Sequence, residues 1–167
     1  LGEQGLQSLR EAQVLLAGDT ESELAIEVEL ARANMLLEQR RFDEALAAIE
    51  PLGLLASSRG DLSATLRDRI FSAQAIALAS LGRHRESQAY RELGLQTTRQ
   101  LYGPRHLRVA VALANLGSGD GRLGEPSRGE QRLLEALSIY DAVFDQPSEY
   151  RGSARLGLGW LLLARGR

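Results

Sequence analysis

The sequence predicts an all-α fold, a right-handed α-solenoid built from antiparallel helix hairpins with about eight helices. Turn residues recur every 42 positions, at Gly82, Gly124 and Gly166, with Arg40 one period earlier. A fixed period of this kind indicates stacked structural repeats. Between the turns, apolar residues recur at helical i, i+3 and i+4 spacing. No two-residue turn joins segments of alternating polarity, so no β-sheet is expected.

The expected helices follow from these apolar runs and from the turns between them. Tight turns at Arg40, Gly82 and Gly124 close hairpins, and longer loops near 58–61, 102–105 and 145–148 join one hairpin to the next. The helices are expected over residues 2–17, 21–39, 42–56, 62–81, 84–101, 106–121, 126–144 and 149–164.

Short polar side chains stand before several of these helices, where they can accept hydrogen bonds from the first N–H groups. Asp19, either Asp61 or Ser63, and Ser148 are expected N-caps. Ser127 is a further candidate, because a glutamate three residues later would complete a capping box.

Length and charge bound the class of protein. The chain has 167 residues, enough for one domain with a core, and its net charge of −2 does not point to nucleic acid. Residues 1–82 carry a net charge of −6 and residues 83–167 of +4, which is either a solvated surface or a polarised partner surface. The sequence has no cysteine and no apolar run long enough to span a membrane, so we expect a cytoplasmic protein.

The loop Tyr102-Gly103-Pro104-Arg105-His106 and the segment Leu113-Ala114-Asn115-Leu116-Gly117 carry a family resemblance. Together with the hairpin pattern and the 42-residue period, they resemble the tetratricopeptide repeat (TPR) of the kinesin-light-chain type. The resemblance covers roughly residues 21–167. It implies a single TPR-like domain over residues 1–167, with a preceding helix at 1–20, repeats at 21–60, 61–103 and 104–146, and the first helix of a fourth repeat at 147–167.

The resemblance also implies where the helices of each hairpin approach closely. In this family small residues lie at the crossing point, here Ala33, Ala75, Gly117 and Gly159 on the first helices and Ala45, Ser87 and Gly129 on the second. Asp120 departs from the pattern, because an aromatic or apolar residue is expected there. The chain begins without methionine and stops within a repeat, so we expect a fragment of a longer protein.

The resemblance implies a non-enzymatic protein-protein interaction or scaffold module that binds a peptide or a helix in a concave groove. Arrays of this type are common as regulatory parts of bacterial signalling proteins, namely kinases and transcriptional regulators. The first helix of each hairpin lines the groove. The partner-binding residues expected from the register are Asn34, Leu37, Arg69, Ser72, Ile76, Val111, Asn115, Ser118, Arg122 and Trp160.

An enzyme is the least favoured alternative. Gly119-x-Gly121-x-x-Gly124 fits a dinucleotide-binding fingerprint, but that motif requires a strand and a parallel sheet, which the sequence does not otherwise indicate. The two histidines, His84 and His106, lie in different repeats, so no metal site is expected. We therefore expect no catalytic, cofactor-binding or metal-binding residues, and no nucleic-acid or membrane partner.

Self-association is the remaining alternative. Residues 156–163 form a helix that is apolar over most of its surface. Such a helix is normally buried on all sides, so a face left open by a missing second helix would be an interaction surface. We expect a second copy of the chain, a neighbouring first helix or further repeats to cover it, which makes a homo-oligomer through the C-terminal helix one outcome.

Overall fold

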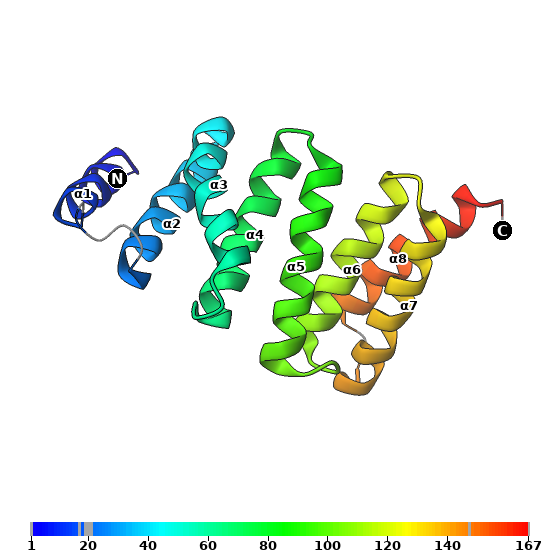
Figure 1. Cartoon of the computed structure of the whole chain (residues 1–167). Helices are drawn as coiled ribbons and strands as arrows, with labels where there is room; N and C mark the ends of the chain where they lie inside the picture. The colour runs from blue at the N-terminus through cyan, green and yellow to red at the C-terminus, as the bar shows by residue number, and fades with distance from the viewer. Residues whose placement is uncertain (1, 17, 19–21, 147, 167) are drawn as a thin grey trace. The chain divides into compact units, whose positions relative to one another are not determined.

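The computed structural model describes residues 2–16, 18, 22–146 and 148–166, and within these ranges every regular element is a helix. Figure 1 shows the helices in chain order. They are α1 (Gly2–Leu15), α2 (Glu23–Glu38), α3 (Phe42–Ser58), α4 (Ala64–Ser80), α5 (His84–Tyr102), α6 (Leu107–Arg122), α7 (Pro126–Val143) and α8 (Glu149–Ala164). The predicted all-α helical-repeat fold is therefore confirmed.

Two of the expected N-caps are confirmed. The Ser63 hydroxyl accepts a hydrogen bond from the Leu66 N–H at 3.3 Å, and Ser148 caps α8 in the same way. The cap of α2 is Ser22, whose hydroxyl accepts from the Ala25 N–H at 3.2 Å. Asp19, the residue expected for this role, lies outside the described residues.

The prediction for Ser127 is wrong. Helix α7 begins one residue earlier, at Pro126, and its N-cap is Glu125, whose side chain makes no capping bond. Proline suits the first helical position because its missing N–H would have no intrahelical partner there and its φ is already helical. Ser127 therefore lies inside the first turn.

The 42-residue period corresponds to a repeated backbone conformation. All four predicted turn residues have a positive φ, namely Arg40 (62°), Gly82 (76°), Gly124 (80°) and Gly166 (72°). The residue that follows each of the first three turn residues donates its N–H to a carbonyl five residues earlier, at 2.9 Å, which is the six-to-one hydrogen bond of a Schellman motif. The three bonds run from Arg41 to Leu36, from Arg83 to Leu78 and from Glu125 to Asp120.

Arg40 is the only one of these residues that carries a side chain against a positive φ. We expect Arg40→Gly to raise the free energy of unfolding by roughly 0.5–1 kcal/mol, because it relieves left-handed strain that outweighs the entropy cost of glycine. Urea titration measures this change. The reverse substitution at the next repeat, Gly82→Arg, should lower stability by a similar amount. Equal stability of both variants and the parent chain would contradict the turn assignment.

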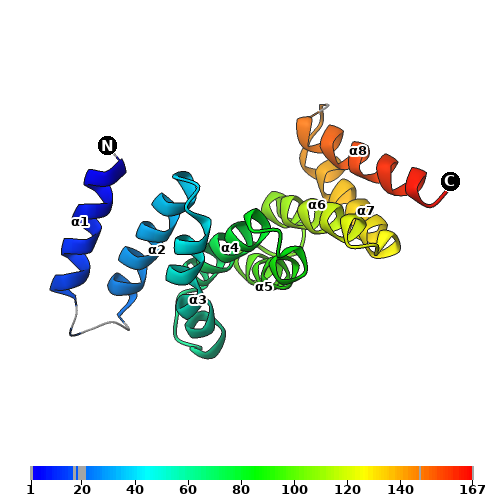
Figure 2. The ribbon, with the colours of Figure 1, turned by 90° about the horizontal axis from the view of Figure 1, so that it is seen from above.

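The chain divides into two compact units, Leu1–Tyr90 and Arg91–Arg167. In the first unit, α1 packs on α2, α3 packs on both α2 and α4, and the first helices α2 and α4 also touch each other. Figure 2 shows α1, α2 and α3 from above. The core of this unit is aliphatic and includes Ile26, Leu30, Ile49 and Ile70, none of which is exposed.

The predicted small-residue contacts are present in the first unit. Ala33 and Ala45 are fully buried, and Ala75 and Ser87 are each 2% exposed. The Ser87 hydroxyl donates a hydrogen bond to the Ala75 carbonyl at 2.7 Å, so α4 and α5 meet backbone to side chain at this point.

We expect Ala75→Leu to lower the free energy of unfolding by about 1–3 kcal/mol, because the added atoms have no space at this crossing. Differential scanning calorimetry of the variant beside the parent chain measures the effect. Ala79→Leu is the control, since Ala79 lies one turn on in α4 and is only half-buried. Equal losses at the two positions would show that Ala75 does not mark the crossing.

In the second unit α7 packs on both α6 and α8, and α6 and α8 also touch. Gly117 and Gly129 form its crossing point. A β-carbon on Gly117 would lie 2.8 Å from the Gly129 carbonyl oxygen, and one on Gly129 would lie 2.6 Å from the Gly117 oxygen. The core of this unit includes Leu113, Leu116, Leu133 and Tyr140.

Candidate interaction surface

The candidate residues of the first unit lie on α2 and α4. Asn34 and Leu37 on α2 are half-buried, whereas Arg69, Ser72 and Ile76 on α4 are exposed. The Arg69 guanidinium donates to Glu27 on α2 at 3.1 Å, so an ion pair joins the two first helices across one period. Ile76 is 49% exposed and is the apolar contact that this surface offers.

The candidate residues of the second unit lie on α6 and α8. Val111 and Ser118 are half-buried, and Asn115, Arg122 and Trp160 are exposed. The Trp160 side chain is 66% exposed, which is high for the largest apolar residue of the chain. Two further leucines extend this surface along α8, Leu156 at 64% and Leu163 at 69% exposure.

Leu156 and Leu163 extend the candidate surface; they lie in the apolar run 156–163 but are not among the partner-binding residues expected from the register. One period earlier these positions are occupied by Ala114 and Gly121 on α6, and Trp160 stands at the position of Ser118. The signal that locates them is the spacing 156, 160 and 163, which puts all three on one helix face. We call Leu156, Trp160 and Leu163 the α8 stripe.

The packing of α8 on α6 holds the stripe outward. Leu161, three turns from the start of α8, is buried against Gly121 and Gly129, where a β-carbon would collide with it. Gly157 lies beside Ser118, whose oxygen would be 3.4 Å from an added β-carbon. Because Leu161 points into the unit, Trp160 and Leu163 on either side of it point away.

The packing and the turn explain two of the three glycines that fit a dinucleotide-binding fingerprint, Gly121 and Gly124. Gly121 leaves room for Leu161, and Gly124 supplies the left-handed turn. The preceding run from Val109 to Leu113 is part of α6, so no strand leads into the motif. Within the described residues no group of three histidine, aspartate or glutamate side chains is placed to hold a metal ion.

The face of α8 that would pack against a following second helix is less apolar than the composition of α8 suggests. In register with the residues of α6 that face α7, α8 carries Arg155, Leu158, Gly159 and Leu162. Leu158 and Leu162 are half-buried, Arg155 is exposed, and nothing lies within 4 Å of a β-carbon on Gly159. The exposed apolar area expected for this helix is therefore the α8 stripe, on a different face.

The charges of Arg91 and Arg122 in the second unit lie close enough to interact. Burial lowers the pKa of the Arg91 guanidinium, and the charge of Arg122 lowers it further. Two like charges in proximity raise the local potential and favour an anionic group nearby.

Asp120 is fully buried within an ion-pair network. The Arg132 guanidinium on α7 donates to the Asp120 carboxylate at 2.7 Å and also pairs with Glu92 on α5. Glu92 in turn pairs with Arg128, which donates to Glu125 at 3.0 Å. Position 120, where an apolar residue is expected, therefore holds a carboxylate that is paired with an arginine from the facing helix. The sequence feature that could have predicted this pair is Arg132, which stands where Tyr90 stands one period earlier.

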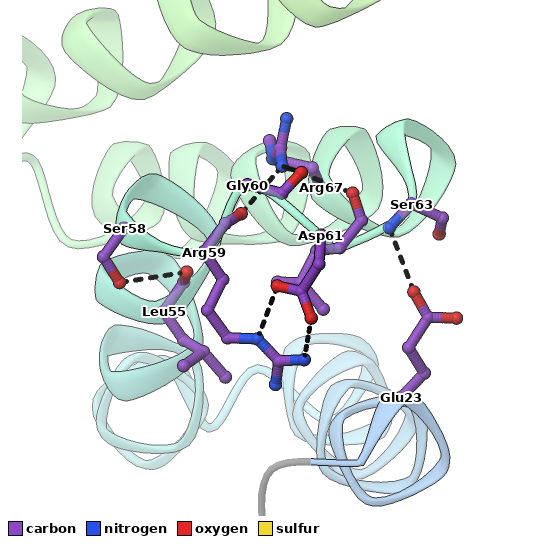
Figure 3. Close-up of polar contacts among 9 residues, drawn as sticks. Glu23, Leu55, Ser58, Arg59, Gly60, Asp61, Ser63 and Arg67 are labelled. Atoms are coloured by element: carbon purple, nitrogen blue, oxygen red, sulfur yellow. Dashed lines mark hydrogen bonds and ion pairs between the residues drawn. The ribbon is translucent and has the colours of Figure 1, made fainter.

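An arginine fixes the loop between α3 and α4, as Figure 3 shows. One nitrogen of Arg67 donates to the carbonyls of Arg59 at 2.8 Å, Leu62 at 3.2 Å and Gly60 at 3.4 Å. The Glu23 carboxylate accepts from the Ser63 N–H at 3.0 Å and so ties the start of α4 to α2. Two periods later Arg151 donates in a similar way to the carbonyls of Phe144 and Gln146 before α8 and of Tyr140 at the end of α7.

The loop between α5 and α6 is stabilised by contacts of Tyr102 and His106 instead. His106 caps α6, where its Nδ1 accepts from the Arg108 N–H at 3.2 Å, and its ring stacks on Tyr102 at 4.7 Å. The Arg108 guanidinium lies 5.2 Å from the centre of the Tyr102 ring. His106 is therefore a residue that caps a helix and packs in its loop.

The Arg59–Asp61 ion pair gives the loop a pH signature. Two hydrogen bonds, of 3.0 and 2.7 Å, join the Arg59 guanidinium to the carboxylate and lower the pKa of Asp61 from 3.8 to about 2. Because the folded pKa is depressed, the pair contributes stability above pH 3.8 that is lost as the pH falls through 2. A ¹³C NMR titration should place the Asp61 midpoint near 2, and Arg59→Met should return it towards 3.8. A midpoint that Arg59→Met leaves unchanged would contradict the pair.

Comparison with known proteins gives the same architecture. Residues 61–142 match the model of the tetratricopeptide repeat family. The structure of BtubC (BKLC) from P. vanneervenii is similar to this chain, with a TM-score of 0.73 and 21% sequence identity. The match covers 98% of this chain and 65% of the BtubC chain, so this chain spans about two thirds of the length of that protein. Two crystal structures show nearly identical TPR-like repeats of a Podosopora anserina putative kinesin light chain. Their TM-scores with this chain are 0.83 and 0.82, at 14% sequence identity, and each match covers 99% of this chain and 79% of the other. No curated protein sequence matches the chain.

The positive-φ turns, the small-residue crossings and the stacked first helices define a helical-repeat protein. By the family match, residues 61–142 are tetratricopeptide repeats, and the chain has the fold of the solved TPR-like repeats of a putative kinesin light chain. Repeats of this family typically mediate protein-protein interaction. None of the helices that the structure describes is both long and apolar enough to cross a membrane.

Proposed function

We propose that the chain is a non-enzymatic protein-protein interaction module that binds a peptide or a helix on the faces of its first helices, α2 with α4 and α6 with α8. The observation that carries this proposal is the exposed α8 stripe together with the exposed Asn115 on the neighbouring first helix α6. Exposed tryptophan and leucine side chains supply buried area on binding, and an asparagine side chain can bond both N–H and C=O of an extended peptide. No cofactor and no nucleic acid takes part in this function.

Selection from a displayed peptide library tests the proposal even though the partner is unidentified. We expect enriched peptides whose binding shifts the NMR signals of Asn115, Ser118 and Trp160. Trp160→Ala and Asn115→Ala should each weaken binding at least about tenfold, because residues at the centre of an interface carry most of its energy. Ser138→Ala, on the exposed side of α7, is the matched control. Binding that maps to α7, or that survives both substitutions, would refute the proposed site.

We further propose that the module is the regulatory part of a cytoplasmic bacterial signalling protein, a kinase or a transcriptional regulator. The resemblance to arrays found in such proteins supports this context. The residues encoded on either side of this segment in its gene test it, and a neighbouring domain of another class would refute it.

Self-association is a second candidate, and the exposure of Leu156, Trp160 and Leu163 favours it. Sedimentation equilibrium over a wide range of concentrations distinguishes the two functions. A dimer that Trp160→Ser dissociates would support self-association through α8. A monomer at all concentrations, with Trp160 emission unchanged on dilution, would exclude it and leave the stripe to a different partner.

A further inference from the structure

A cleft in the first unit is lined by residues other than the candidate partner-binding residues of α2 and α4. It has a volume of about 310 Å³, at the lower end of the range for small-ligand sites. It lies between α1 and α3, across α2, and most of its wall is apolar. Its lining residues are Gln13, Leu16, Ala25, Glu29, Arg32, Ala47, Ala48, Pro51 and Leu52.

Three polar side chains meet at this cleft. The Arg32 guanidinium donates to both carboxylate oxygens of Glu29, with Nε to oxygen distances of 3.1 and 3.2 Å, and the Gln13 amide donates to the same carboxylate. Glu29 and Arg32 are each about three-quarters buried or more. Their charges therefore cancel, while the Nη1 group of Arg32 has no hydrogen-bond partner among the described residues.

Pro51 adds an acceptor to the same cleft. It lies in the interior of α3 and has no N–H, so the Ala47 carbonyl, four residues earlier, cannot close the usual helical hydrogen bond. Ala47 and Pro51 both line the cleft and both are exposed. The cleft thus combines a guanidinium donor and a carbonyl acceptor that lacks its helical hydrogen bond with apolar walls of alanine, leucine and proline side chains.

We propose that this cleft binds a small neutral group with an apolar ring and a hydroxyl, of the phenol type. The ring fits between the apolar walls, and the hydroxyl accepts from Arg32 and donates to the Ala47 carbonyl. A charged head group is disfavoured, because an anion would compete with Glu29 for Arg32 and a cation would compete with Arg32 for Glu29. The two sources of this chemistry are a free phenolic molecule and the tyrosine side chain of another protein.

NMR titration of the ¹⁵N-labelled chain with p-cresol tests the proposal. We expect shifts confined to the cleft, at Gln13, Ala25, Arg32 and Ala47, and binding of toluene and of p-toluate at least several-fold weaker. N-acetyltyrosinamide binding as tightly as p-cresol would assign the cleft to a tyrosine side chain, and binding of p-cresol alone would assign it to a free molecule. No shift at these residues in millimolar p-cresol would overturn the proposal.

Three variants test the parts of the cleft separately. Arg32→Met should weaken p-cresol binding about tenfold, because it removes a charged donor. Pro51→Ala should weaken it several-fold while the helix is retained, because the restored N–H occupies the Ala47 carbonyl. Arg83→Met, which breaks an exposed pair of the same spacing with Glu86, is the matched control and should leave binding unchanged. Circular dichroism confirms that each variant is folded, and equal binding by all folded variants would overturn the assignment of the head group.

Discussion

Arg132→Met is expected to lower the free energy of unfolding by about 3–5 kcal/mol, because it leaves the Asp120 carboxylate in the protein interior without its guanidinium partner. Breaking one member of a buried ion pair costs more than the pair itself contributes, since the remaining charge has already lost its water. Urea denaturation followed by circular dichroism measures the loss.

Two further variants make this result specific. Arg128→Met removes an arginine from the same network, but that side chain is half exposed, so we expect a loss of at most about 1 kcal/mol. The double variant Asp120→Leu with Arg132→Tyr introduces the residue types found at these register positions one period earlier, Leu78 and Tyr90, and should recover most of the stability. A single Arg132→Met variant as stable as the parent chain would show that the pair is not formed.

Gly117→Ala is expected to lower stability by about 2–3 kcal/mol, although alanine is the better helix former by about 1 kcal/mol. The reason is that the new β-carbon would lie 2.8 Å from the Gly129 carbonyl oxygen, and a backbone atom cannot move aside as a flexible side chain can. Thermal unfolding followed by circular dichroism measures the change.

Gly159→Ala is the matched control, because Gly159 has the same place in α8 and nothing lies within 4 Å of its added β-carbon. We expect this variant to gain roughly 0.5–1 kcal/mol from helix propensity alone. Opposite signs at the two positions would support both the register and the open face of α8. Two losses of equal size would mean that α8 is covered at this point in solution.

The turns and the helices could be predicted from the sequence because each depends on local information. A residue at a left-handed turn must tolerate a positive φ, so glycine marks Gly82, Gly124 and Gly166, and the repeated spacing identifies Arg40 even without glycine. The crossing residues followed from the family resemblance, carried along the same register. The boundaries of the three repeats stay a prediction, as do the partner-binding roles of Asn34 and the other candidate residues.

Pairings between side chains on different helices could not be predicted in the same way, because they depend on how the helices pack. Asp120 is recognisable as an exception, but its meaning depends on Arg132 across the hairpin, and a buried pair looks like two surface charges until both helices are placed. Ser127 satisfies the pattern of a capping box, but a proline one residue earlier starts the helix. The cleft beside Pro51 requires three helices to be packed, which no local pattern describes.

The Asp120–Arg132 pair also has a consequence for how the chain avoids mispairing. Hairpins of equal geometry could exchange partners during folding, since a slip of one period preserves every turn and crossing. If α6 folded against α5 in place of α7, Asp120 would meet Tyr90 and would be buried without a cation, a mismatch that works against the wrong pairing. We therefore expect that α6 and α7 can be transplanted into another array only together, and that a chimera carrying one of them alone aggregates or unfolds. Recombination among such repeats would then have to exchange whole hairpins, because a single helix could not be exchanged without its partner.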